Sequence, residues 1–130
     1  MIVIDTSVLI DALHRKEDAM RKILELEETG ESLCTTQVNI LELYKGAYSP
    51  TKSEKGLKKV KALLEAFAIL PIDDDAYDMF GELSAELKRR GESIGDFDEL
   101  IAAIALVHRA TIVSSDGHFR RVPGLKIDSA

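Results

Sequence analysis

Short apolar runs alternate along the chain with longer segments in which apolar residues recur every three or four positions. The short runs predict buried strands at residues 1–4, 32–35, 68–72, 111–115 and 125–127. The longer segments predict helices at about residues 8–13, 17–29, 36–48, 53–67, 73–90 and 97–109. Strands that alternate with one or two helices are typical of an α/β domain. We therefore predict a central, mostly parallel sheet of about five short strands flanked by helices.

Capping residues mark several of the helix ends. Thr6 or Ser7 is expected to cap the first helix with its hydroxyl. Gly30 suits the position just after the end of the second helix, where the backbone often turns left-handed. In "GDFDEL", Asp96 followed three residues later by Glu99 fits a capping box, with Asp96 at the N-cap.

The length and composition are those of an ordinary globular protein. The 130 residues are expected to form one domain, 1–130, and 45% of them are hydrophobic and 31% charged. No apolar stretch is long enough to span a membrane, and the N-terminus lacks the pattern of a secretion signal. Cys34 is the only cysteine, so the chain can form no internal disulfide. We expect a cytoplasmic protein with no membrane partner.

Acidic residues outnumber basic ones by 23 to 17, which gives a net charge of −6. A protein that binds nucleic acid by neutralising phosphates is usually basic, so this balance counts against tight binding of that simple kind. It is compatible with a site for divalent cations, which needs clustered acids. The chain has only two amide residues, Gln37 and Asn39, beside many Glu and Lys, a bias typical of thermophilic proteins.

Two acids lie where predicted strands end. Asp5 follows "MIVI" and Asp116 follows "TIVSS". In open parallel sheets, ligands bind beyond the carboxyl ends of the strands. A charge at the end of a buried strand is costly, so either a helix terminus or a metal ion is expected to stabilise Asp5. Asp116, which precedes Gly117, also fits an ordinary turn residue.

Two further acids lie on predicted helices. Glu42 alone would fit an exposed helical acid that pairs with Lys45. Asp98 falls in the first turn of a helix, where the helix dipole is its only structural explanation and a weaker one than the capping role of Asp96. Asp98 therefore ranks above Asp96 as a metal ligand. The histidines are scattered singly, and only His118 lies close in sequence to one of these acids. No motif for a nucleotide, a zinc ion or a serine nucleophile is present.

Four segments in this order resemble the PIN-domain family, and most closely its small single-domain toxins of the VapC kind. The segments are "IDTSVLIDAL" near the N-terminus, "ELYKG" at 42–46, "GESIGDFDELIAAIAL" at 91–106 and "ATIVSSDGHFRRVPGL" at 110–125. The resemblance implies a PIN fold. It also implies an acidic quartet and two supporting hydroxyl residues, with Asp96 at a variable position as a secondary candidate. The quartet is Asp5, Glu42, Asp98 and Asp116, and the hydroxyl residues are Thr6 and Ser114.

The resemblance further implies a metal-dependent endoribonuclease that leaves a 5′-phosphate on RNA and favours structured targets such as transfer or ribosomal RNA. Four clustered carboxylates repel one another, and one or two Mg²⁺ or Mn²⁺ ions would supply the counter-charge. By the same analogy, the protein is the toxin of a type II toxin–antitoxin pair and a homodimer. A VapB-like antitoxin would cover the acids with its C-terminal segment.

Basic residues gather between positions 45 and 61, where Glu54 is the only acid. If the helices of this region form a hairpin, these lysines could flank the acids and guide RNA toward them. The RNA-binding candidates are Lys45, Lys52, Lys55 and Lys59. The alternative is an ordinary solvated helix face.

Three rival functions stay open at this point. A housekeeping PIN nuclease that processes RNA would carry the same acids. A receiver-like phosphotransfer domain would need a lysine near the last acid, and "TIVSSDGHF" offers none. A non-catalytic binding module would keep the four acids without using them.

Overall fold

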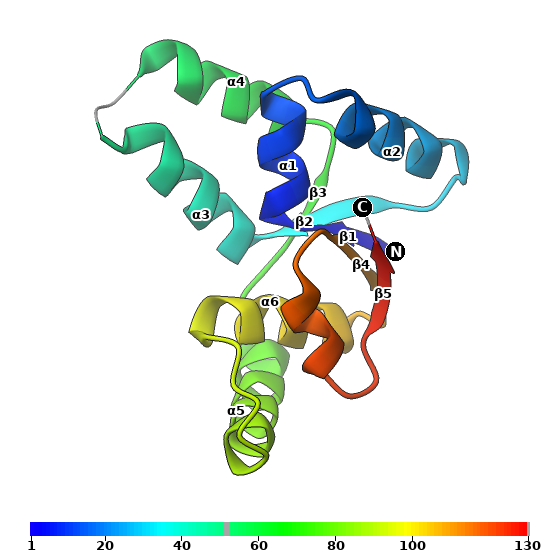
Figure 1. The fold of residues 1–130 in the computed structure, drawn as a ribbon, viewed down its shortest axis with the longest axis vertical. Helices are drawn as coiled ribbons and strands as arrows, with labels where there is room; N and C mark the ends of the chain where they lie inside the picture. Colours follow the sequence, from blue (N-terminus) through cyan, green and yellow to red (C-terminus); the bar gives the residue numbers. More distant parts are fainter. Residues whose placement is uncertain (51–52, 130) are drawn as a thin grey trace.

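The strands form one parallel sheet in the computed structural model, which describes residues 1–50 and 53–129 (Figure 1). They are β1 (Ile2–Ile4), β2 (Leu33–Thr36), β3 (Ala68–Leu70), β4 (Thr111–Ser114) and β5 (Lys126–Ser129). Their order across the sheet is β3-β2-β1-β4-β5, and every pairing is parallel. The predicted α/β architecture with about five short strands is confirmed.

Helices cover both faces of this sheet. They are α1 (Thr6–Leu13), α2 (Glu17–Glu28), α3 (Gln37–Tyr48), α4 (Glu54–Leu64), α5 (Asp74–Arg89) and α6 (Asp96–Val107), with a 3-10 helix η1 (Gly117–Arg121) that the sequence did not predict. α1, α2 and α4 lie on one side of the sheet, and α5 and α6 on the other (Figure 1). α3 continues from β2 and contacts α1, α4 and α6. Within the described ranges, no helix is long and apolar enough to cross a membrane.

The core follows the two-residue period of the strands. Val3 and Ile112 point into a cluster with the apolar residues of α5 and α6, while Ile2 and Ile4 point into a second cluster that includes Leu9 of α1. Successive strand residues thus face opposite helical layers. Such a sheet, buried on both faces, reads in the sequence as a continuous apolar run, which is why "MIVI" predicts a strand.

Several boundaries differ from the predicted ones by one to three residues. α4 ends at Leu64 and not at 67, although Phe67 is buried just before β3. β3 ends at Leu70, because Pro71 has no N–H to donate to a neighbouring strand. α6 begins at Asp96 and its N-cap is Gly95, whose φ of +100° favours glycine. The predicted capping box, with Asp96 at the N-cap, is therefore wrong.

Candidate functional site

The carboxyl ends of β1 and β4 meet at the centre of the sheet, where the strand order changes direction. β2 and β3 extend the sheet on one side of this pair, and β5 extends it on the other. The Asp5 N–H, just after β1, donates to the Val113 carbonyl of β4 at 2.9 Å. Crevices of this kind bind ligands in open α/β sheets. The topology thus places Asp5 next to Ser114 and Asp116.

Two helices bring the other acids to the same edge. Thr36 ends β2 and is the N-cap of α3, so Glu42 lies within the second turn of a helix that starts at the carboxyl edge. Asp98 lies in the first turn of α6. The charges of Asp5 and Glu42 both act on Asp98, which places all of them in one electrostatic neighbourhood.

Asp5 is 5% exposed and its carboxylate is held by neutral donors. Ser114 Oγ donates to Oδ2 at 2.7 Å and Ser7 Oγ donates to the same oxygen at 3.3 Å. Asn39 Nδ2 donates to Oδ1 at 3.1 Å. Side-chain hydrogen bonds, which the sequence did not reveal, therefore stabilise the buried charge before any cation binds.

The first helix is not capped as predicted. Its N-cap is Asp5, which makes no side-chain cap hydrogen bond, and the expected caps Thr6 and Ser7 lie inside the helix. Their hydroxyls donate to carboxylates instead: Thr6 to Glu42 and Ser7 to Asp5. A carboxylate is a stronger acceptor than a neutral group, so these hydroxyls serve the site and not the helix end.

Glu42 is half-buried and accepts a hydrogen bond of 2.6 Å from the Thr6 hydroxyl at Oε1. Burial raises the pKa of Glu42, the hydrogen bond from Thr6 opposes that shift, and the Asp5 charge adds to it. Asn39 Nδ2 donates to Thr6 Oγ1 at 2.9 Å. A chain of hydrogen bonds therefore connects Asp5 to Glu42 through Asn39 and Thr6.

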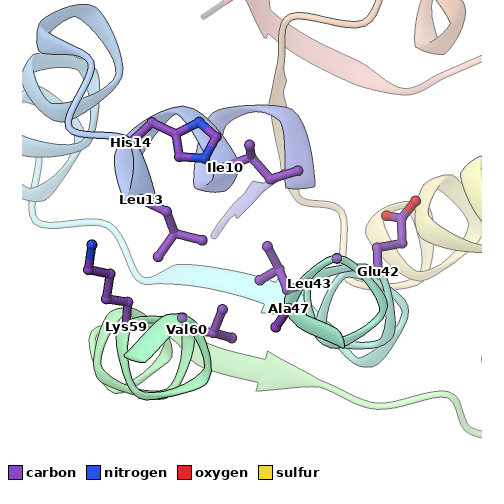
Figure 2. A pocket seen from close by; sticks show the side chains of 10 residues that line it. Ile10, Leu13, His14, Glu42, Leu43, Ala47, Lys59 and Val60 are labelled. Carbon is purple, nitrogen blue, oxygen red and sulfur yellow. The ribbon is translucent and has the colours of Figure 1, made fainter. Parts of the chain in front are cut away.

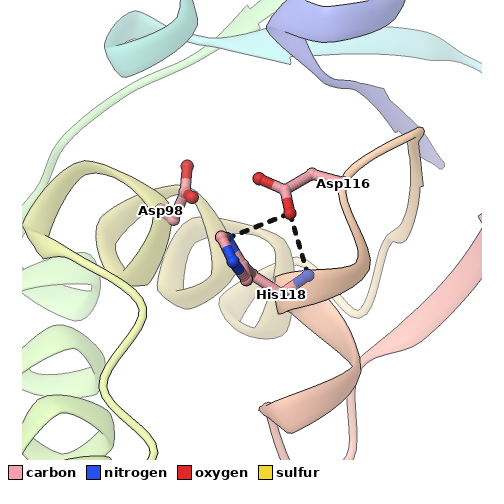
Figure 3. A group of neighbouring side chains, drawn as sticks. All are labelled: Asp98, Asp116 and His118. Atoms are coloured by element: carbon pink, nitrogen blue, oxygen red, sulfur yellow. Dashed lines mark hydrogen bonds and ion pairs between the residues drawn. The ribbon is translucent and has the colours of Figure 1, made fainter.

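Asp98 and Asp116 face each other with His118 beside them (Figure 3). One possible ligand atom from each of the three lies within 4.8 Å of the other two. His118 Nδ1 is 3.1 Å from Asp116 Oδ1, and the His118 backbone N–H donates to the same oxygen at 2.9 Å. The pKa of Asp98 is raised to about 6, mainly by burial and further by the charges of Asp5, Asp116 and Glu42. Positive charge on His118 opposes it.

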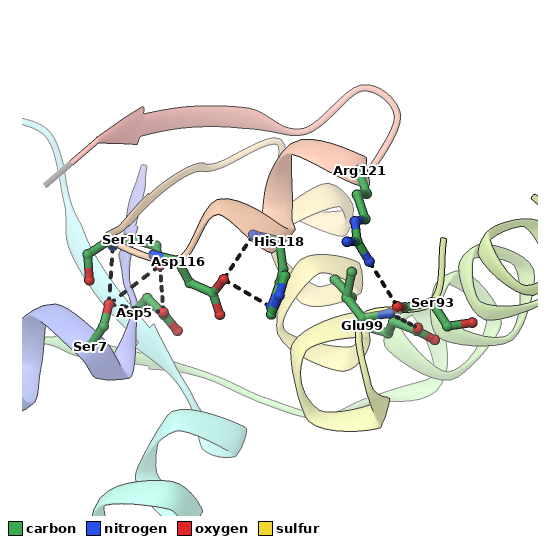
Figure 4. A network of polar contacts seen from close by, with 10 residues as sticks. Asp5, Ser7, Ser93, Glu99, Ser114, Asp116, His118 and Arg121 are labelled. Atoms are coloured by element: carbon green, nitrogen blue, oxygen red, sulfur yellow. Dashed lines mark hydrogen bonds and ion pairs between the residues drawn. The ribbon is translucent and has the colours of Figure 1, made fainter. Parts of the chain in front are cut away.

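Glu99 fixes the loop before α6 (Figure 4). It is 3% exposed, and it accepts from the Ser84 hydroxyl at 2.5 Å and from the Ile94 N–H at 3.0 Å. Arg121 of η1 donates to the Ser93 carbonyl of the same loop at 3.2 Å. Glu99 thus bonds to the loop and to α5, and not to the helix N-cap as predicted. Asp96 is exposed at the first position of α6.

An apolar groove of about 380 Å³ opens beside Glu42, between α1, α3 and α4 (Figure 2). Its apolar lining is Ile10, Leu13, Leu43, Gly46, Ala47, Gly56 and Val60. His14, Glu42 and Lys59 supply its polar groups. Lys45 and Lys55 are exposed on α3 and α4, whereas Lys52 lies outside the described residues.

Three residues of the site have no distinct signal in the sequence. Asn39 is one of two amide residues at the start of a helix, Ser7 was expected as a cap, and His118 is one of three scattered histidines. The nearness of His118 to Asp116 in sequence is the only sign that could have pointed to it. Asn39 becomes recognisable only when α3 is packed against the end of β1.

The fold and sequence match known proteins over nearly the whole chain. The family model described as PIN domain matches residues 2–125. "Ribonuclease VapC2" of Rickettsia felis is 27% identical over 128 residues, covering 98% of this chain and 96% of that protein. "tRNA(fMet)-specific endonuclease VapC" of Salmonella typhimurium is 27% identical over 127 residues, covering 97% and 95%. The crystal structure of VapBC2 from Rickettsia felis bound to a DNA fragment from their promoter matches with a TM-score of 0.91 and 26% identity, covering 100% of this chain and 99% of that one.

Proposed function

Because this chain belongs to the PIN-domain family, we propose that it is a metal-dependent endoribonuclease and the toxin of a VapBC-type toxin–antitoxin pair. The observation that carries the proposal is the convergence of four acids from four separate segments at the strand-order reversal. They lie so close that the negative charges of the other three help to raise the pKa of Asp98 to about 6. Structural stability alone gives no reason to gather like charges there.

The donor set suits Mg²⁺ or Mn²⁺. Carboxylate oxygens are the ligands that both cations prefer, and Mn²⁺ also accepts an imidazole nitrogen. We assign the metal-holding role to Asp5, Glu42, Asp98 and Asp116, with His118 as an additional candidate and one or two ions in all. A bound divalent cation supplies positive charge that offsets the negative charge developing on a phosphodiester during hydrolysis. Asp96 is exposed and has no part in this proposal.

Hydrolysis of RNA requires that the scissile phosphate reach this acidic edge although the protein is negatively charged overall. Lys59 lines the groove that Glu42 also lines, and Lys45 and Lys55 are exposed on the same pair of helices. We propose that these lysines hold the RNA backbone beside the site. Because a relative is named for its action on tRNA(fMet), transfer RNA is the first substrate to test.

We further propose that a VapB-like antitoxin binds in the groove of α1, α3 and α4 and covers Glu42. The groove is mostly apolar with a charged rim, which fits an amphipathic segment of a partner protein. A homodimer and a cytoplasmic location complete the proposal. The first follows from analogy with the family, and the second from the cytoplasmic RNA that such a toxin acts on.

The decisive experiment is cleavage of total RNA and of transfer RNA by the purified protein with Mg²⁺, with Mn²⁺ and with EDTA. We expect new 5′-phosphate ends with either metal and none with EDTA. Cleavage that persists in EDTA would contradict the metal requirement. Cleavage without growth arrest on expression in a bacterial host would favour an RNA-processing nuclease over a toxin.

Filling the groove is expected to weaken antitoxin binding. Gly46 lines the groove, and a Cβ built there meets no atom within 4 Å, so a Gly46→Leu side chain can enter it. We expect affinity for the antitoxin to fall at least about tenfold, or about 1.4 kcal/mol, in a calorimetric titration. RNA cleavage is measured in parallel, because Glu42 and Lys59 line the same groove.

Gly81→Leu is the matched control, because Gly81 lies in α5 and also has open space around it. Both changes replace a helical glycine and gain similar helix propensity. Equal loss of antitoxin binding in the two variants would remove the groove from the interface.

A further inference from the structure

Asn39 is fully buried, and the direction of its amide is forced. Its Oδ1 accepts from the backbone N–H of Thr36 at 3.1 Å and from the Thr36 hydroxyl at 2.7 Å. A backbone N–H can only donate, so the atom facing it must be the amide oxygen. The Nδ2 group therefore points the other way, toward the end of β1.

Both Nδ2 hydrogens have acceptors in the acidic site. One goes to Asp5 Oδ1 at 3.1 Å and the other to Thr6 Oγ1 at 2.9 Å. Because Thr6 Oγ1 accepts from Asn39, its own hydrogen is free to point elsewhere, and it lies 2.6 Å from Glu42 Oε1. The amide thus fixes the direction of the Thr6 hydroxyl as well as the position of Asp5.

We propose that Asn39 is a positioning residue that sets Asp5 and Glu42 in their metal-binding arrangement before a cation arrives. This inference rests on the proposed metal-dependent function. Two like charges would move apart in the absence of a cation, and a rigid neutral group between them prevents that movement. The site therefore needs little rearrangement when the metal binds, and affinity is higher for that reason.

A merely structural role has to be distinguished, because Asn39 also belongs to the capping box of α3. Thr36 Oγ1 accepts from the Asn39 backbone N–H at 3.2 Å, and this bond caps the helix. Thr36→Val removes the two hydrogen bonds that the Thr36 hydroxyl makes with Asn39. The Thr36 backbone N–H still donates to Asn39 Oδ1, so the Asn39 Nδ2 group still faces Asp5 and Thr6. Asn39→Leu removes the amide with a side chain of similar size.

The test is Mn²⁺ binding by the purified full chain without RNA, measured by calorimetry and by the electron paramagnetic resonance signal of free Mn²⁺. Asn39→Leu is expected to weaken binding about 10- to 100-fold. Thr36→Val is expected to weaken it by less than about threefold, although both variants melt at lower temperature. Equal weakening in the two variants, or wild-type binding by Asn39→Leu, would overturn the inference.

Thr6→Val keeps the test decisive if Asn39→Leu does not fold. Thr6 is half-buried, and its loss cuts the bond to Glu42 while Asn39 still holds Asp5. We expect Mn²⁺ affinity to fall about three- to tenfold, and unchanged affinity would contradict the chain of contacts. If the wild-type protein binds no Mn²⁺ at all, the proposed function itself fails, which is a different result from failure of Asn39 alone.

Discussion

Replacing Asp5 with asparagine is expected to lower metal-dependent RNA cleavage about 100- to 1000-fold. The change removes one negative charge at the centre of the acidic site while keeping the shape of the side chain. The Ser114 and Ser7 hydroxyls can still donate to the amide oxygen in the place of Oδ2. The new amide nitrogen would then face Asn39 Nδ2, a donor against a donor, so a small loss of stability is also expected. Single-turnover cleavage of transfer RNA at saturating Mg²⁺ measures the effect.

Asp96→Asn is the control for this experiment. Asp96 also carries a charge near the site, at the first position of α6, but it is exposed. Its rate should stay within about twofold of wild type, as for a surface charge screened by solvent. A similar loss in both variants would mean that net charge, and not the place of Asp5, controls cleavage. Full activity of Asp5→Asn would remove Asp5 from the mechanism.

The parts of the fold that depend on apolar periodicity could be predicted from the sequence. The run "MIVI" is apolar throughout because both faces of β1 are covered by helices, and this pattern also predicts where the strand ends. Parallel strands share one carboxyl edge, so Asp5 and Asp116 could be expected at the same place. That Glu42 and Asp98 lie at the same edge could be predicted only from the family resemblance.

The hydrogen-bond partners could not be predicted, because they depend on packing between distant segments. Thr6 and Ser7 have the residue types of helix caps, and only the presence of carboxylates nearby turns their hydroxyls elsewhere. Glu99 is three residues after Asp96 as a capping box requires, yet Ser84 and the Ile94 N–H are better placed to satisfy it in the buried site. Local spacing cannot reveal a partner on another helix.

The two pairs of acids are supported differently. Asp5 and Glu42 receive hydrogen bonds from neutral side chains, so their arrangement is fixed within the protein. Burial is the main cause of the raised pKa of Asp98, about 6, and the charges of Asp5, Asp116 and Glu42 raise it further toward that value. A carboxylate that is ionised at neutral pH despite this raised pKa lowers the stability of the metal-free protein, but it is available to bind a cation. Removing the charge of Asp98 should therefore raise the stability of the metal-free protein.

Asp98→Asn is expected to lower cleavage about 100-fold or more and to stabilise the metal-free protein at pH 7. The ordinary pKa of this carboxyl is 3.8, and in the folded protein it is about 6. Between these values the folded state binds more protons than the unfolded state, so the stability of the wild type falls as pH rises through this window. Asparagine carries no charge at any pH. The variant should match the wild type near pH 4 and exceed it at pH 7 by on the order of 1 kcal/mol, since solvent screens this half-exposed group.

Urea unfolding at both pH values, with EDTA and then with Mg²⁺, measures this difference. Mg²⁺ binds the folded wild type and should raise its stability, while Asp98→Asn should gain much less. The difference in free energy of unfolding between Asp98→Asn and the wild type at pH 7 should therefore shrink or change sign when the metal is added. A variant that is less stable than wild type in EDTA at pH 7 would show that Asp98 supports the fold by contacts that outweigh its repulsion. An equal gain from Mg²⁺ in both proteins would exclude Asp98 as a ligand.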